Sequence, residues 1–179
     1  MMENKYIYAQ SDALSFCIHY LFDNSMMAFS PEGRFEECNS LFEVFLQNRG
    51  LQRDFFNQQH HQEPMQRLID FGVIIENNGV LSLNQKVAYI LRQLHDKEVL
   101  CSHHCPDVHE EIEKLMNSGD LRASSTLFSE PEQEYLDYIL NKSTFSDGLD
   151  LRNKYAHGTI FRDDRLNSRD YLEFLIIIV

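Results

Sequence analysis

The chain has 179 residues, enough for one domain of moderate size or two small ones, and 43% of them are hydrophobic, which supplies a core. Only 4 Pro and 7 Gly are present, which argues against a β-rich or loop-rich architecture. The net charge of −12 argues against broad, non-specific nucleic-acid binding, because phosphate contacts require clustered Lys and Arg.

No targeting or membrane segment is expected. Residues 1–12 are too polar for a signal peptide, and the longest apolar run, at 174–179, is much shorter than a membrane span. We therefore expect a cytoplasmic protein with no membrane partner. Its four cysteines are then expected to be free thiols: Cys17, Cys38, Cys101 and Cys105.

The first half of the chain is expected to be mostly helical. Apolar residues at helical spacing predict helices over 13–22, capped by Ser11 or Asp12, and over 35–47 and 51–59. A further helix is expected to start at Pro64 and end at Gly72, and another covers 85–94.

A β-hairpin is expected near 73–83, where two short apolar runs flank Asn77-Asn78-Gly79. A helix, a hairpin and a second helix in this order resemble a winged-helix element, which binds DNA in many proteins and has a structural or protein-binding role in others. The tip of this wing, 76–79, carries no Lys or Arg, and the preceding helix offers only Arg67. A DNA-binding regulator is therefore a third functional hypothesis, and DNA is an unlikely partner.

Two thiols and three imidazoles fall within the nine residues Cys101–His109, and both groups are zinc ligands in proteins. Four ligands from one short loop are uncommon, and the spacing matches no familiar zinc module. We expect an irregular loop that holds no metal.

The second half is also expected to be helical. One helix is predicted over 107–117, and a second begins at a capping box formed by Ser129 and Glu132. A third is predicted over 169–179, with Asn167 or Ser168 as its cap. The short, polar and irregular segment 119–128 suggests a boundary, which divides the chain into 1–126 and 127–179. The expected fold class is mainly α, with a C-terminal helical bundle preceded by a helical region that contains one small hairpin.

Chemistry is concentrated in the segment 148–158, GLDLRNKYAHG. Arg152 is a phosphate-binding cation, Asn153 a polar orienting group and His157 a proton-transfer group. Together they could cleave RNA without a metal or other cofactor: His157 takes the proton of a ribose 2′-hydroxyl, whose oxygen attacks the adjacent phosphorus and leaves a cyclic phosphate.

This segment resembles the signature of the HEPN superfamily. In that signature an Arg is usually followed by a polar residue, and a His comes four to six residues further on. Leu149, Leu151, Ala156 and Gly158 match the flanks as well. The resemblance covers about 127–179 and implies a dimeric helical bundle, found in metal-independent endoribonucleases of toxin and antiviral defence systems. It equally allows a HEPN-like interaction module that binds without cutting.

Geometry favours a homodimer for an active site of this kind. Residues five apart on a regular helix lie about 140° apart around its axis, so Arg152 and His157 diverge unless a second subunit supplies one of them. Lys154, Arg162 and Arg165 are expected to add substrate-binding charge. In the structural alternative, the motif only braces a helix: Arg152 pairs with a nearby Asp, His157 caps the helix end, and Arg162 and Arg165 pair with their acidic neighbours.

Overall fold

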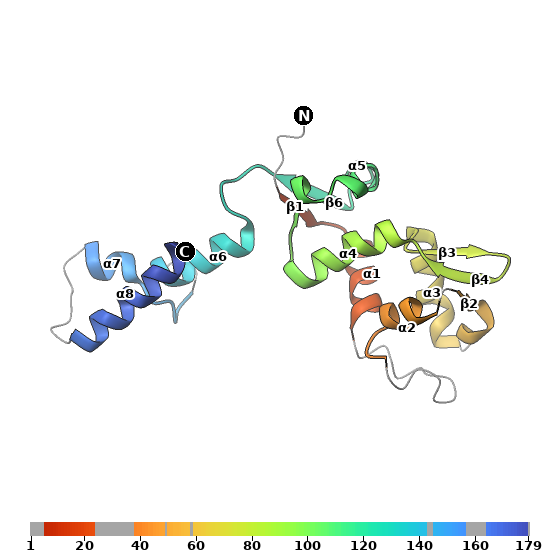
Figure 1. Ribbon diagram of the computed structural model, residues 1–179, viewed down its shortest axis with the longest axis horizontal. Coiled ribbons are helices and arrows are strands. Elements are labelled where there is room, and N and C mark those ends of the chain that lie inside the picture. The colour runs from red at the N-terminus through yellow and green to blue at the C-terminus, as the bar shows by residue number, and fades with distance from the viewer. Residues whose placement is uncertain are drawn as a thin grey trace. The chain divides into compact units, whose positions relative to one another are not determined.

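The computed structural model describes residues 6–23, 38–48, 50–57, 59–142, 145–156 and 164–178. The chain divides into two compact units, Met1–Thr126 and Leu127–Val179 (Figure 1). The described residues are mainly α-helical, with two small antiparallel sheets in the first unit, which confirms the expected fold class. Over these same residues, no helix has the length and apolar character that crossing a bilayer would require.

The first unit is organised around α1 (Asp12–Phe22), which contacts α2, α3 and α4. Ser11 caps this helix by accepting a hydrogen bond from the Leu14 backbone N–H, as its sequence predicts. The buried face of α1, including Leu14, Cys17 and Leu21, forms the centre of the unit's core.

The hairpin expected near 73–83 is confirmed as β3 (Ile74–Asn77) and β4 (Val80–Leu83), whose turn residues Asn78 and Gly79 both have positive φ. The strand β2 (Leu51–Gln52) pairs with β4, and this gives the sheet order β2–β4–β3. Before the hairpin come α2 (Leu41–Gln47), the short 3₁₀ helix Arg53–Phe56 and α3 (Gln59–Phe71). This order of elements is that of a winged helix.

Two helix predictions in this region are wrong in their bounds. Residues 51–59 do not form one helix, because Leu51 and Gln52 pair with β4 instead. Helix α3 does not start at Pro64 but contains it, since a proline this close to a helix start removes only one backbone hydrogen bond. The start of the predicted helix 35–47 lies outside the described residues; residues 38–40 are not helical, and α2 begins only at Leu41, where Ser40 caps it.

A second sheet, β5–β1–β6, was not expected from the sequence. It consists of β1 (Tyr6–Ala9) between β5 (Leu100–Cys101) and β6 (Leu121–Ser124). Segment 119–128 is therefore not wholly irregular, because pairing with β1 orders it. Helices α4 (Gln85–Lys97) and α5 (His109–Asn117) complete the unit, joined by the 3₁₀ turns Ser102–His104 and Pro106–Val108 in place of the expected loop.

The second unit contains α6 (Glu130–Leu140), α7 (Leu151–Ala156) and α8 (Asp164–Ile178). The predicted capping box of Ser129 and Glu132 is present at α6. Helix α8 begins before the expected caps, so Asn167 and Ser168 lie inside it, among residues that favour a helix.

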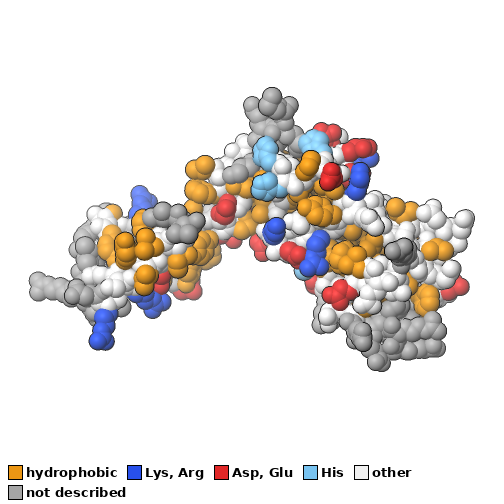
Figure 2. Space-filling view, in the orientation of Figure 1, with side chains coloured by type: hydrophobic (Ala, Val, Ile, Leu, Met, Phe, Trp, Pro, Cys, Tyr) orange, Lys and Arg blue, Asp and Glu red, His pale blue; other side chains and the backbone are white. Residues whose placement is uncertain are grey.

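This second unit has little core of its own. Among its described residues, Ile139 and Leu151 are the buried apolar side chains. Figure 2 shows hydrophobic side chains gathered on the surface of this unit, and the exposed ones include Tyr171, Leu172 and Ile176 of α8. A unit of this size is too small to bury its apolar groups well.

Candidate functional site

The sequence motif enters the structure through a tight connection between α6 and α7. A Cβ atom on Gly148 would lie 2.9 Å from the backbone oxygen of Tyr138 and 3.0 Å from that of Asn141, so this position has no room for a side chain. The next residue, Leu149, donates its N–H to the same Tyr138 oxygen over 2.9 Å. The first part of the motif therefore fixes where α7 begins.

Asp150 starts α7 in the left-handed conformation, with φ of 54°. Its backbone oxygen accepts from the Lys154 N–H over 3.1 Å, and its carboxylate accepts from the Asn153 side-chain amide over 2.8 Å. Asn153 is exposed, and its amide is thus engaged in holding the first turn of the helix. Asp150 is not paired with Arg152, as the structural alternative would have had it.

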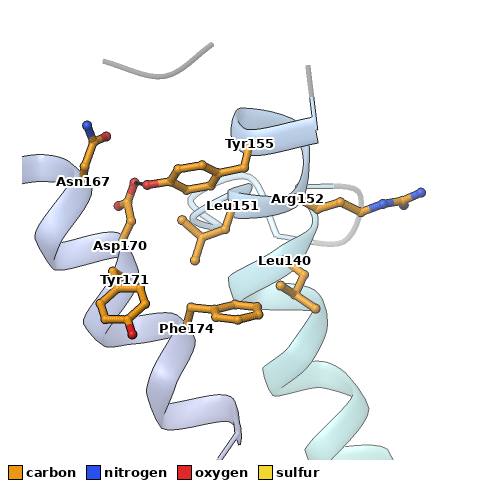
Figure 3. A pocket seen from close by; sticks show the side chains of 8 residues that line it. All are labelled: Leu140, Leu151, Arg152, Tyr155, Asn167, Asp170, Tyr171 and Phe174. Carbon is orange, nitrogen blue, oxygen red and sulfur yellow. Dashed lines mark hydrogen bonds between the residues drawn. The ribbon is translucent and has the colours of Figure 1, made fainter. Parts of the chain in front are cut away.

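Three residues at helical spacing share one face of α7: Leu151, Lys154 and Tyr155. Leu151 is buried, and Lys154 forms an ion pair with Asp170 of α8 in which the side chains are only 17% and 12% exposed. The Tyr155 hydroxyl donates to the same carboxylate over 2.8 Å (Figure 3). The carboxylate of Asp170 therefore links α7 to α8.

The charge state of this link follows from its partners. Partial burial acts to raise the pKa of Asp170, but hydrogen bonds from Lys154 and Tyr155 outweigh it and lower that pKa below its ordinary value. Partial desolvation and the hydrogen bond to Asp170 both raise the pKa of Tyr155. At neutral pH Asp170 is thus an ionised carboxylate and Tyr155 a neutral phenol.

The Arg152 side chain extends in a different direction from these contacts (Figure 3). It is exposed and makes no hydrogen bond or ion pair with any residue that the structure describes. In Figure 3 its guanidinium extends away from α8, whereas Tyr155 points toward it. Of the predicted cationic residues on α7, Arg152 is exposed and Lys154 is turned inward.

The remaining site residues of the sequence hypothesis are not all placed. His157 and Arg162 lie outside the described residues, so their positions relative to Arg152 stay predictions. Arg165 is exposed in the first turn of α8. The structure thus brings Arg152, Asn153 and Lys154 onto one short helix, and gives each a different environment.

A cavity of about 610 Å³ opens between α7 and α8, lined mainly by apolar and aromatic side chains. Its lining residues are Leu140, Leu151, Arg152, Tyr155, Asn167, Asp170, Tyr171 and Phe174 (Figure 3). Sequence analysis did not identify the α8 members of this set. The available signal was their spacing, since Asn167, Asp170, Tyr171 and Phe174 share one face of a helix.

The winged element offers few groups for DNA. Arg53 forms an ion pair with Glu76 and donates to the Gln66 side chain over 2.8 Å. Arg67 lies 3.6 Å from the centre of the Phe16 ring. Arg53 and Arg67 are therefore both engaged by side chains of the first unit.

The Cys101–His109 segment shows no shared ligand geometry. The Cys105 thiol is buried and lies 3.7 Å from the Tyr89 hydroxyl, whereas His103 and His104 are exposed. Across the part of the chain that the structure describes, no three His, Cys, Asp or Glu side chains are grouped so as to hold a metal ion.

Comparisons with known proteins place no family on this chain: no protein-family model matches it, and no curated protein or solved structure matches it significantly.

Proposed function

We propose that this protein is a metal-independent endoribonuclease of the HEPN type, with its active site on the second unit. The observation that supports it is the state of Arg152. Its neighbours Leu151, Lys154 and Tyr155 are occupied in holding α7 in place, whereas Arg152 is exposed and unpaired among the described residues. Among the described residues nothing pairs with this guanidinium, and a phosphate-binding role would explain why Arg152 is exposed.

In the proposed reaction Arg152 binds the scissile phosphate through two parallel hydrogen bonds. His157 removes the proton from the ribose 2′-hydroxyl, and the 2′-oxygen attacks the phosphorus. The bond to the 5′-oxygen of the next nucleotide breaks, that oxygen takes up a proton, and a 2′,3′-cyclic phosphate remains. Because Arg152 and His157 are five residues apart, a second copy of the chain is proposed to complete the site, as part of a toxin or antiviral defence system.

The test is cleavage of single-stranded RNA in excess chelator. Wild type should leave cyclic phosphate ends, and His157→Ala should lower the rate by about 10²–10⁴-fold, as loss of a general acid–base group does. Arg152→Ala should also lower it, and Arg152→Lys should not restore it fully, because Lys lacks the planar pair of donors.

Arg169→Ala is the matched control for loss of a positive charge, since Arg169 is exposed on α8 and, of the residues that the structure describes, pairs with Glu173 over 2.9 Å. This variant should cleave as wild type does. If wild type, Arg152→Ala and His157→Ala are equally inactive on all RNAs tried, the enzyme proposal is wrong.

The second candidate function is a HEPN-like interaction module that associates without cutting. The exposed apolar residues Leu172 and Ile176, 61% and 64% exposed on α8, favour it. They lie on a different face of α8 from Tyr171 and Phe174, by helical spacing. Sedimentation should then show association that Leu172→Glu weakens, in a protein with no RNA cleavage; a wild type that stays monomeric at micromolar concentration would rule this candidate out.

A further inference from the structure

The walls of the cavity between α7 and α8 are suited to a flat, aromatic ligand. Tyr155 borders it from α7, and Tyr171 and Phe174 border it from α8 (Figure 3). Its volume of about 610 Å³ lies within the range of small-molecule sites, which is roughly 300–1,000 Å³. Aromatic side chains stack on any unpaired base, because every base has a π-face.

The charge around the cavity favours a ligand that carries a phosphate. Asp170 lines the cavity, but its charge is neutralised by its ion pair with Lys154, so it does not repel an anion. Arg152 also borders the cavity, and its guanidinium extends outward from it (Figure 3). An apolar site with one unpaired cation at its edge matches a nucleotide, which has a flat base and an adjacent phosphate.

We propose that this cavity receives an unpaired base of single-stranded RNA, stacked on Tyr171 and Phe174, while Arg152 binds the adjoining phosphate. This inference rests on the proposed function and deepens it, since it names the place where a base next to the bound phosphate would be held. A base in a duplex is stacked between its neighbours and cannot enter.

The competing occupant is an apolar side chain from a second copy of the chain. That occupant would satisfy the aromatic wall but would give Arg152 no anion to bind. The chain also offers a second copy a different surface, the face of α8 that carries Leu172 and Ile176. The nucleotide accounts for both the aromatic wall and the unpaired cation.

The experiment uses the full chain and a short single-stranded RNA that is 2′-O-methylated throughout, so that 2′-hydroxyl attack is blocked. Its Kd is measured by fluorescence anisotropy, with the same sequence as a duplex for comparison. Tyr171→Ala and Phe174→Ala should each raise the Kd by about 5- to 100-fold, the loss expected for one stacked base. Tyr135→Ala is the matched control, because Tyr135 is an aromatic side chain of α6 that is 48% exposed and does not line the cavity, and it should leave the Kd unchanged.

A photo-crosslink locates the base directly. An RNA of the same design with one 4-thiouridine should crosslink to the peptides that carry Tyr171 and Phe174, and the duplex should not. Arg152→Ala should weaken binding and reduce the salt dependence by about one phosphate contact.

The outcomes separate this inference from the proposed function. Binding with these properties by a protein that cleaves no natural RNA would support the base site and overturn the nuclease. If wild type cleaves RNA but the Tyr171→Ala and Phe174→Ala variants each bind RNA with an unchanged Kd, the base site alone is overturned. If those variants change only the sedimentation of the protein, the second copy is the occupant and the inference is wrong; no measurable binding by wild type overturns it too.

Discussion

The ion pair between Lys154 and Asp170 should be the main support of α7. Asp170→Asn keeps the size of the side chain but removes its charge, which leaves the Lys154 ammonium only 17% exposed and without its carboxylate. Breaking a buried pair in this way costs about 3–5 kcal/mol. Because both side chains keep some contact with water, we expect a loss of about 2–3 kcal/mol.

The stability lost in Asp170→Asn should be confined to the second unit and should be large relative to the stability of that unit. Apart from Ile139 and Leu151, no described apolar side chain of this unit is buried, so little else opposes the separation of α7 from α8. Hydrogen exchange followed by mass spectrometry should show faster exchange in the peptides covering 151–156 and 164–178, and no change in those of the first unit.

Two further variants test whether the loss of the Lys154–Asp170 charge pair causes this destabilisation. Arg169→Ala removes the ion pair with Glu173, in which the Arg side chain is 73% exposed. It should change the opening free energy measured by hydrogen exchange by less than about 0.5 kcal/mol. The double variant Lys154→Met with Asp170→Leu should recover much of the loss, because an apolar pair needs no charge compensation. If Asp170→Asn exchanges as wild type does, the ion pair does not hold α7.

The same link gives a pH dependence with a definite sign. The folded pKa of Asp170 lies below its ordinary value of 3.8, so the ionised form is favoured by folding. This contribution to stability is complete above the ordinary value and is lost as the pH falls from about 4 through the lower folded pKa. Exchange in α7 and α8 should therefore rise in that acid range in wild type and be less pH-dependent in Asp170→Asn.

Two other predictions concern particular contacts. Gly148→Ala should destabilise the second unit by about 1–3 kcal/mol in urea unfolding, because the added Cβ would lie 2.9 Å from a backbone oxygen; Ser146→Ala, at an exposed position of the same connection, should have no measurable effect. Burial raises the pKa of the Cys17 thiol to about 12, so native protein treated with iodoacetamide near pH 8 should be alkylated at the partly exposed Cys101 and not at Cys17, as peptide mass spectrometry would report. Equal alkylation of both thiols in folded protein would contradict this.

Elements with strong local signals could be predicted from the sequence. Ser11 and Ser129 cap α1 and α6 as expected, and Asn78-Gly79 forms the hairpin turn. Each of these features depends on residues a few positions apart, and their preferences are the same in most proteins.

The β5–β1–β6 sheet could not be found in this way. Strand β5 has only two residues, and β1 and β6 are more than a hundred residues apart, as the pair Ile7 and Ala123 shows. A strand this short is ordered by its partners rather than by its own propensity. Segment 119–128 therefore looked irregular in the sequence although part of it is paired.

The candidate site shows the same division between local and distant signals. Arg152 belongs to a local motif and could be selected from the sequence, whereas Asp170 lies in a different helix and is joined to the motif only by folding. Lys154 looked like a substrate-binding cation because its carboxylate partner is sixteen residues further on.

The short length of α7 connects the support of the helix to the proposed chemistry. Six residues are too few for a helix that is stable by itself, so α7 depends on tertiary contacts to hold Arg152 in place. Those contacts are made by Leu151, Lys154 and Tyr155, whereas the Arg152 side chain extends away from α8. Catalytic groups lose much of their effect when displaced by about 1 Å, which can cost about 10²-fold. Asp170, which need touch no substrate phosphate, should therefore act as a positioning residue: Asp170→Asn should reduce RNA cleavage in proportion to the loosening of α7, and the Lys154→Met, Asp170→Leu double variant should restore both together.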